Sequence, residues 1–249
     1  MRQYRNAGPR CQPVRPPLVD RLLAAVLPWR CLLCRDAAAG MDLCIDCLND
    51  LPWLNGVCPV CGSRLPDAGL RNCGPCSVSR PLFSQSIAAL AYEFPVPEMV
   101  AAMKFGRQRS HARVLGELLS IRLQEVRAEG SLLLPDVLIP VPLSGRRLLR
   151  RGFNQAEIIA ASLATELQLP LDKTSLIRHR HSQPQSGLRG SARQKNIRGC
   201  FRLRGRRLVN RHVAVVDDVL TTGATMNEIV KVLLRGGVRD VSVWTVTRA

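Results

Sequence analysis

The sequence predicts an α/β protein, with a parallel sheet flanked by helices and a small cysteine-rich module in front of it. Three observations lead to this prediction. After residue 81, short apolar segments typical of buried strands alternate with longer segments of helical periodicity. Between residues 31 and 76, eight cysteines fall into four Cys-x-x-Cys pairs. An apolar strand at residues 213–216 leads into two aspartates and a threonine-rich turn.

The first 80 residues divide into a tail, a helix and the cysteine-rich module. Residues 1–17 carry Arg, Pro and Gln without periodicity, and we expect a disordered tail there. From Leu18 to Leu27, apolar residues keep helical spacing until Pro28, which predicts a short amphipathic helix. We therefore assign residues 18–80 to this helix and a double zinc-ribbon module, and residues 81–249 to the α/β domain.

The paired cysteines predict two structural zinc sites. Two thiolates that lie two residues apart reach one ion, and two such pairs complete a closed tetrahedral Zn²⁺ site. Sequence order assigns the first four cysteines to one ion and the last four to another, although an interleaved arrangement stays open. Cys11 and Cys200 are expected to be non-ligands. The predicted ligands are Cys31, Cys34, Cys44, Cys47, Cys58, Cys61, Cys73 and Cys76.

Three other uses of these cysteines are less favoured than zinc binding. Disulfides need an oxidising compartment, and no export signal precedes the module. An iron–sulfur cluster also takes four thiolates, but the regular pairing favours zinc. Redox activity of a single Cys-x-x-Cys lacks the usual βαβ context. Zinc is therefore the ion that these cysteines are expected to bind.

The α/β region is expected to contain four longer strands, and a further strand is expected to start near Phe201. Apolar segments at residues 86–92, 137–142, 213–216 and 241–246 have strand composition, and Trp244 is assigned to the core. Helical periodicity covers residues 111–127 and 228–235, and another helix ends near Lys104. His111 is expected on the surface. A basic loop is predicted from Ser144 to Arg151, followed by a helix that begins with a capping box formed by Asn154 and Glu157.

The turn after the third strand has the properties of a phosphate site. In an open α/β sheet, ligands bind at the carboxyl ends of the strands, where a helix N-terminus offers unpaired N–H groups. Gly223 lets the backbone approach closely, and nearby threonine hydroxyls add donors. Asp217 and Asp218 suit vicinal hydroxyls, bound directly or through a divalent cation. A phosphate together with a diol indicates a ribose 5-phosphate.

These residues resemble the phosphoribosyl-diphosphate (PRPP) signature of type I phosphoribosyltransferases, which is two apolar residues, two acids and Thr-x-Gly-x-Thr. The match is complete from Val215 to Thr225. The resemblance implies a type I phosphoribosyltransferase-like sheet, with Asp217 and Asp218 on the ribose hydroxyls and Mg²⁺ on the diphosphate. It also implies that the 5-phosphate lies among Thr221, Thr222, Gly223, Ala224 and Thr225. The alternative is a generic strand followed by a threonine-rich turn.

Basic residues elsewhere are candidates for binding the diphosphate. In such a transferase one loop must cradle the leaving diphosphate, and the segment from Ser144 to Arg151 supplies positive charge. Residues 178–199 are polar, basic and without periodicity, and we interpret them as a lid that excludes water from bound PRPP. Solvated arginines on a basic face are the alternative. The candidates are Arg146, Arg147, Arg150, Arg151, Arg189, Arg193 and Lys195.

Two further stretches extend the resemblance to a narrower family. Residues 140–143 run on to Arg151-Gly152-Phe153-Asn154-Gln155, and Gln185-x-x-Leu188 is followed by Arg193, Asn196, Gly199 and Phe201. These two stretches and the eight cysteines make the chain similar to the ComF/GntX family of double-zinc-ribbon proteins. That resemblance implies a role in natural competence with single-stranded DNA on the cytoplasmic side, together with competence-machinery proteins. One branch is associated with gluconate utilisation.

Charge and hydropathy narrow the function further. The formal net charge is +17, and residues 144–211 hold 16 Lys or Arg against 3 acids, a net of +13. Such a field favours polyanions such as nucleic acid or diphosphates. No apolar run reaches the length needed to span a bilayer, so we expect a cytoplasmic protein.

Two functions from different classes follow from these residues. One is an active phosphoribosyltransferase, in which the zinc module and the first helices form a hood over the acceptor. Purine salvage is disfavoured because Thr221 stands where relatives with that activity often have an acid. The other is a nucleic-acid- or protein-binding module that keeps the PRPP pocket as a sensor. The acceptor cannot be identified from the sequence.

Overall fold

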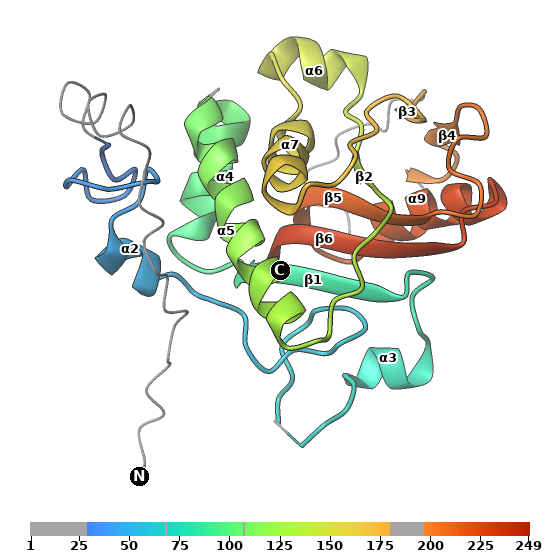
Figure 1. Ribbon diagram of the computed structural model, residues 1–249, viewed down its shortest axis with the longest axis horizontal. Coiled ribbons are helices and arrows are strands. Elements are labelled where there is room, and N and C mark those ends of the chain that lie inside the picture. The colour runs from blue at the N-terminus through green and yellow to red at the C-terminus, as the bar shows by residue number, and fades with distance from the viewer. Residues whose placement is uncertain (1–28, 68, 107, 180–196) are drawn as a thin grey trace.

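The computed structural model of the protein describes residues 29–67, 69–106, 108–179 and 197–249 (Figure 1). The expected tail at residues 1–17, the helix at 18–27 and Cys11 lie outside the described residues, as do the lid candidates Arg189, Arg193 and Lys195.

A four-stranded sheet forms the centre of the molecule, in the order β1-β6-β5-β2, and every neighbouring pair is parallel. Parallel strands end at the same edge of a sheet, so the residues that follow β1, β2, β5 and β6 gather on one side of the molecule. The predicted parallel α/β class is confirmed. The strands are β1 (Gln85–Ala91), β2 (Val137–Pro140), β5 (His212–Leu220) and β6 (Asp240–Arg248).

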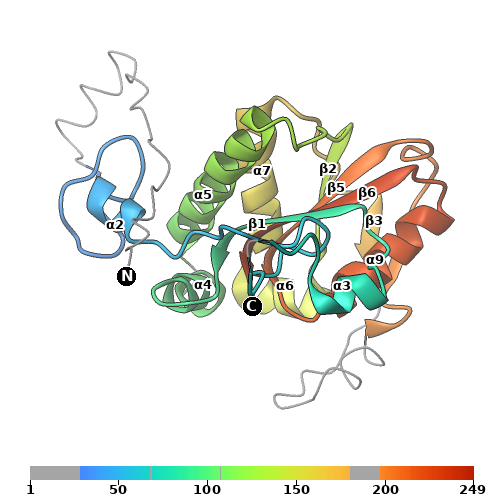
Figure 2. The same cartoon turned by 90° about the horizontal axis from the view of Figure 1, so that it is seen from below.

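Helices cover both faces of this sheet (Figure 2). Figure 2 shows α5 and α7 on one side of the strands and α9 on the other. The apolar positions predicted for α5 and α7 are all buried, because their spacing places them on one face of each helix. The helices are α4 (Val96–Phe105), α5 (Arg109–Ala128), α6 (Gly145–Arg151), α7 (Gln155–Leu167) and α9 (Ala224–Arg235).

The alternation of side chains along β5 divides the core into two halves. Ala214 and Val216 pack with α4, α5 and α7, whereas Val213 and Val215 pack with α9. Trp244 of β6 is completely buried in the first half, as predicted. A small antiparallel pair, β3 (Leu176–Arg178) and β4 (Phe201–Leu203), closes the second half through Leu176 and Phe201.

The cysteine-rich module is not a separate globule. It contains two short helices, α2 (Ile45–Asn49) and α3 (Gly74–Val78). Cys31, Leu43, Leu48 and Leu51 belong to the same core cluster as α4 and α5, and the segment around α2 lies beside α5 (Figures 1 and 2). The chain between the two halves of the module then covers the open edge of β1, where Leu54 N–H donates to the Ala89 carbonyl at 2.9 Å.

Four local predictions were wrong. The two aspartates lie inside β5, which continues to Leu220, because β6 pairs with the whole segment. The basic loop is a helix, α6, which ends at Gly152 in the left-handed conformation. Asn154 precedes α7, but its amide donates to the Val141 carbonyl at 3.1 Å and forms no capping box. His111 is buried, because it lies on the inner face of α5.

Candidate functional site

The candidate PRPP site lies at the carboxyl edge of the sheet, where β5 ends and α9 begins. Asp217 and Asp218 lie three and two residues before the end of β5, and the turn from Thr221 to Gly223 follows. Gly223 precedes α9 with φ +73°, a conformation that favours glycine. Helix α9 begins directly after this turn, with no side-chain cap on its first N–H groups.

The turn is open. A Cβ at Gly223 would meet only Asn227 Nδ2, at 4.0 Å. Thr221 and Thr222 are exposed, and Thr225 is half-buried. Asn227 N–H donates to the Gly223 carbonyl at 2.8 Å, which fixes the first turn of α9. An open turn at the start of a helix is the kind of geometry that anion-binding turns use.

The two aspartates have different surroundings. Asp218 is 7% exposed, and its Oδ2 lies 2.7 Å from Lys104 Nζ at the end of α4. Asp217 Oδ1 accepts a hydrogen bond from Asp218 N–H at 2.9 Å. Burial raises the pKa of Asp217 well above its ordinary value, and the charge of Asp218 raises it further. The pair is therefore an electrostatically costly arrangement, which a ligand with hydroxyl donors or a cation would relieve.

One of the predicted cations lies close to this pair. Arg151 is half-buried; burial lowers the pKa of its guanidinium, and the charge of Asp218 partly offsets that effect. Its Nη1 donates to Gln155 Oε1 at 3.0 Å, and the guanidinium lies 5.9 Å from the centre of the Phe105 ring. Arg146 and Arg150 are exposed on α6.

Three further basic residues at the site were missed by sequence reasoning. Lys104 pairs with Asp218. Arg178, at the end of β3, lies over the Phe201 ring, and burial lowers its pKa while Asp217 raises it. Arg248 donates from Nη1 to the Leu220 carbonyl at 3.1 Å and also to the Thr221 carbonyl, so it fixes the start of the turn. Each stands at the end of a helix or strand, where basic residues are common, so the sequence gave no distinguishing signal.

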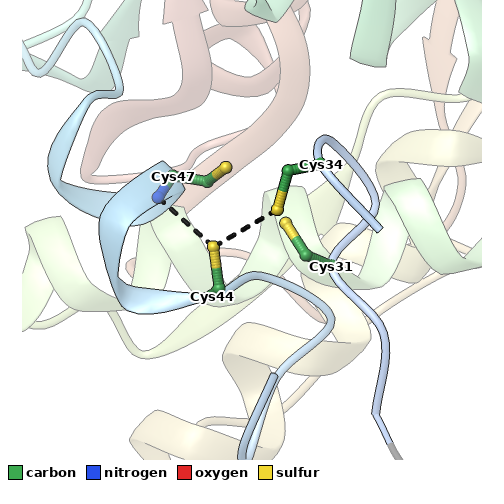
Figure 3. A group of neighbouring side chains, drawn as sticks. All are labelled: Cys31, Cys34, Cys44 and Cys47. Atoms are coloured by element: carbon green, nitrogen blue, oxygen red, sulfur yellow. Dashed lines mark hydrogen bonds between the residues drawn. The ribbon is translucent and has the colours of Figure 1, made fainter. Parts of the chain in front are cut away.

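The eight paired cysteines form two clusters. Within each, the sulfur atoms all lie within 4.8 Å of one another, and the grouping follows the sequence: Cys31, Cys34, Cys44 and Cys47 in one, and Cys58, Cys61, Cys73 and Cys76 in the other. Figure 3 shows the first group converging, with Cys34 Sγ 3.6 Å from Cys44 Sγ. Zn–S bonds of about 2.3 Å in a tetrahedron place sulfurs about 3.8 Å apart. The clusters fit zinc in number, chemistry and spacing.

One thiol in each cluster is poised to ionise. Burial raises the pKa of Cys31, but backbone N–H groups of Cys34 and Cys44 outweigh it and lower the pKa to about 6. Backbone N–H groups of Cys73 and Cys61 similarly lower the pKa of Cys58 to about 7 against the effect of burial. Thiolate is the form that ligates zinc. Cys200 is buried apart from both clusters, as expected for a non-ligand.

Comparison with known proteins matches both parts of the chain. The double zinc ribbon domain family matches residues 22–77, and the phosphoribosyl transferase domain family matches residues 148–248. The DNA utilization protein YhgH of Shigella flexneri is 34% identical over 224 residues, covering 89% of this chain and 98% of that protein. Competence protein F of Haemophilus influenzae is 33% identical over 228 residues, covering 89% and 97%. Competence protein ComFC of Bacillus subtilis is 27% identical over 244 residues, covering 93% and 94%.

Solved structures give weaker matches. The allosteric regulatory enzyme of purine biosynthesis is 22% identical with a TM-score of 0.36, covering 54% of this chain and 25% of that one. Purine phosphoribosyltransferase from Pyrococcus horikoshii is 18% identical with a TM-score of 0.30, covering 52% and 66%.

These features define a class of protein: a phosphoribosyltransferase-like α/β protein with an N-terminal double zinc ribbon. They are the parallel sheet, the aspartate pair and the two four-cysteine clusters. The identity to curated relatives over most of their length is more specific. The chain belongs to the ComF/GntX family, alongside competence protein F and the YhgH proteins. Within the described part of the chain, every helix is too short or too polar to cross a bilayer.

Proposed function

We propose that the protein binds PRPP at the carboxyl edge of its sheet and acts, in the cytoplasm, on or with single-stranded DNA during natural competence. The observation that carries the first half is the pairing of an open turn at Gly223 with two acids inside the preceding strand. The turn receives the 5-phosphate, and Asp217 and Asp218 accept hydrogen bonds from the ribose hydroxyls. Ribose hydroxyls can replace the Lys104 contact as partners of Asp218.

Magnesium accompanies PRPP in this proposal. Carboxylate oxygens are the hard ligands that Mg²⁺ prefers, so the local chemistry suits the ion together with diphosphate oxygens. Arg151 and Lys104 add positive charge beside the same edge. Mg²⁺ would neutralise charge on the diphosphate and strengthen it as a leaving group.

The DNA half of the proposal is supported by the relatives and by charge. Two relatives carry names that refer to competence and one to DNA utilization. The net charge of +13 over residues 144–211 suits a polyanion. Competence-machinery proteins are further proposed partners, and the zinc module is the surface we assign to them.

A calorimetric titration with Mg²⁺-PRPP tests the first half. The wild-type protein should bind, and Asp217→Asn and Asp218→Asn should each weaken binding by tenfold or more, since each removes an acceptor for a ribose hydroxyl. Glu129→Gln removes the same charge at the exposed C-terminus of α5 and serves as the matched control. Equal affinity in all four proteins would show that the aspartates do not hold the ligand.

Catalysis of phosphoribosyl transfer is the second candidate function. Arg151 and Lys104 beside the aspartates favour it, because a leaving diphosphate needs positive charge where it develops. Diphosphate release should then depend on both PRPP and an added acceptor, and should fall at least a hundredfold in Arg151→Gln. Binding of PRPP without release in the presence of nucleobases, nucleosides and single-stranded DNA would leave the protein as a sensor.

A further inference from the structure

The exposed aromatic residues gather at the edge of the sheet that holds the candidate site. Among the described aromatic residues, three are exposed: Tyr92 at 41%, Phe94 at 79% and Phe105 at 70%. Tyr92 and Phe94 follow the carboxyl end of β1, and Phe105 ends α4. Aromatic composition is low, at 4%, so this grouping is not a consequence of abundance. Exposed aromatic residues at the same edge as a candidate site are candidates for a binding surface.

Contacts of Tyr92 and of Lys104 tie the segments that carry Tyr92 and Phe105 to the PRPP turn. Tyr92 N–H donates to the Arg248 carbonyl at 3.1 Å, and the Arg248 guanidinium donates to the Thr221 carbonyl. Phe105 directly follows Lys104, whose ammonium pairs with Asp218. The Phe105 ring therefore lies at the rim of the site.

One guanidinium group lies close to the Phe105 ring. The Arg151 guanidinium lies 5.9 Å from its centre, in the range of a cation–π contact. The exposed arginines of α6 lie on the same helix as Arg151. An exposed ring beside the guanidinium of Arg151, on a helix with three further arginines, combines the two features that hold single-stranded nucleic acid. These are a flat apolar face for a base and cations for phosphates.

We propose that Phe105 stacks a base of single-stranded nucleic acid, with Arg151 and the arginines of α6 on the flanking phosphates. This docks the strand directly beside the ribose 5-phosphate turn. The inference rests on the proposed function for its meaning, because the stacked nucleotide is then the acceptor-side ligand of the PRPP site.

The same rim has features that a protein partner would also use. Leu149 of α6 is 85% exposed and offers a second apolar contact. The surrounding charge decides in favour of nucleic acid, since α6 carries four arginines in seven residues and no acid. An apolar protein interface is depleted in charge at its centre.

Two strands of equal length separate stacking from electrostatics. A labelled oligothymidylate carries bases and phosphates, and an abasic strand carries phosphates alone. Phe105→Ala should weaken binding of the thymidylate strand by about tenfold, within the range for loss of one base–aromatic stack. It should leave binding of the abasic strand unchanged. Phe105→Leu keeps an apolar side chain but not the flat face and should behave like Ala, whereas Phe105→Trp should retain affinity.

Leu133→Ala is the matched control, because Leu133 is 78% exposed and precedes β2 at the opposite edge of the sheet. It should change neither affinity. Competition by thymidine monophosphate distinguishes a free nucleotide from a strand: displacement at equal concentration of nucleotide units would assign the ring to free nucleotides and overturn the strand proposal.

Three results would contradict the proposal. Unchanged thymidylate affinity in Phe105→Ala would remove the stacking contact. An equal loss on both strands would show a structural or electrostatic role. Retained affinity in Phe105→Leu would show that a flat face is not required. Mg²⁺-PRPP binding, measured on the same variants, reports separately on the proposed function, since Phe105→Ala should leave it unchanged.

Discussion

At the scale of single residues, Asp217 shows the conflict between stability and ligand binding. Its carboxyl is buried beside a second acid, so the pKa in the folded protein is raised. For a carboxyl with a raised folded pKa, stability is greatest below the unfolded pKa and falls as pH rises through the folded pKa. As pH rises above the ordinary pKa of a carboxyl, Asp217 therefore destabilises the ligand-free protein.

Asp217→Asn should consequently be more stable than wild type at pH 7, by on the order of 1 kcal/mol, since each pKa unit corresponds to about 1.4 kcal/mol. The difference should shrink as pH falls through the raised pKa. Denaturant unfolding at several pH values measures it. Asp136→Asn should show the opposite sign, because a hydrogen bond from His212 N–H lowers the pKa of Asp136. A less stable Asp217→Asn at neutral pH would contradict the account.

Sequence reasoning at this scale is most specific where several residue types are constrained together. The acids and the turn at 221–225 occupy a fixed pattern, and so do the paired cysteines, because ligand geometry dictates spacing. Lys104, Arg178 and Arg248 carry no such pattern, since each meets the site only through tertiary packing. Their roles depend on which helix or strand ends lie at the carboxyl edge of the sheet. A single basic residue at the end of a helix or strand does not indicate this position.

At the scale of elements, the two cysteine clusters differ in what they support. The first shares the main core through Cys31 and Leu48, and Asp42 beside it pairs with Arg113 of α5. The second forms its own small cluster with Val60 and Leu65. The first zinc site should therefore stabilise the phosphoribosyltransferase-like domain as well as the module.

Cys31→Ser should lower the free energy of unfolding of the main transition by on the order of 3 kcal/mol, a large single-residue effect that comes from losing a metal ligand in a packed core. Cys61→Ser should lose zinc from the second site but shift the main transition less. Calorimetric unfolding together with zinc content per chain checks this. Equal shifts in the two variants would show that both sites are coupled to the core alike.

The helices and strands that could be predicted from sequence were those with a clear pattern of apolar residues. The four strands and the helices α5 and α7 were confirmed, because each buries one face or both faces in a continuous core. Helix α6 was predicted as a loop since it buries none of its own residues and has no apolar face to show. In the β3–β4 pair only the start of β4 near Phe201 was expected. Each strand is three residues long, too short for a strand period to be visible.

At the scale of the whole molecule, charge governs the proposed encounter with DNA. The logarithm of the affinity for a single strand should fall linearly with the logarithm of the salt concentration. The reason is that phosphates bound by the protein release their counterions. Arg146→Gln should reduce that slope by about one phosphate contact. Arg71→Gln, an exposed arginine in the zinc module, is the control. Fluorescence anisotropy across a salt series measures the slopes, and identical slopes in Arg146→Gln and wild type would place the strand elsewhere than α6.

Domain organisation was the hardest property to infer from sequence. The composition changes near residue 80, and the division into a zinc-ribbon module before it and an α/β domain after it stays a prediction. Packing crosses it, since Leu54 and Ala88 share one apolar cluster and the segment before Leu54 completes the edge of the sheet. Long-range contacts of this kind follow from burial of an open strand edge, which local patterns do not specify.

The central claim is that the turn after β5 holds a ribose 5-phosphate while Asp217 and Asp218 hold its hydroxyls. A crystal structure of the zinc-loaded protein with Mg²⁺-PRPP tests it most directly. We expect the 5-phosphate among residues 221–225 and the ribose hydroxyls within hydrogen-bond distance of the two carboxylates. An empty turn with PRPP bound at another place, and with the Lys104–Asp218 pair unchanged, would contradict it.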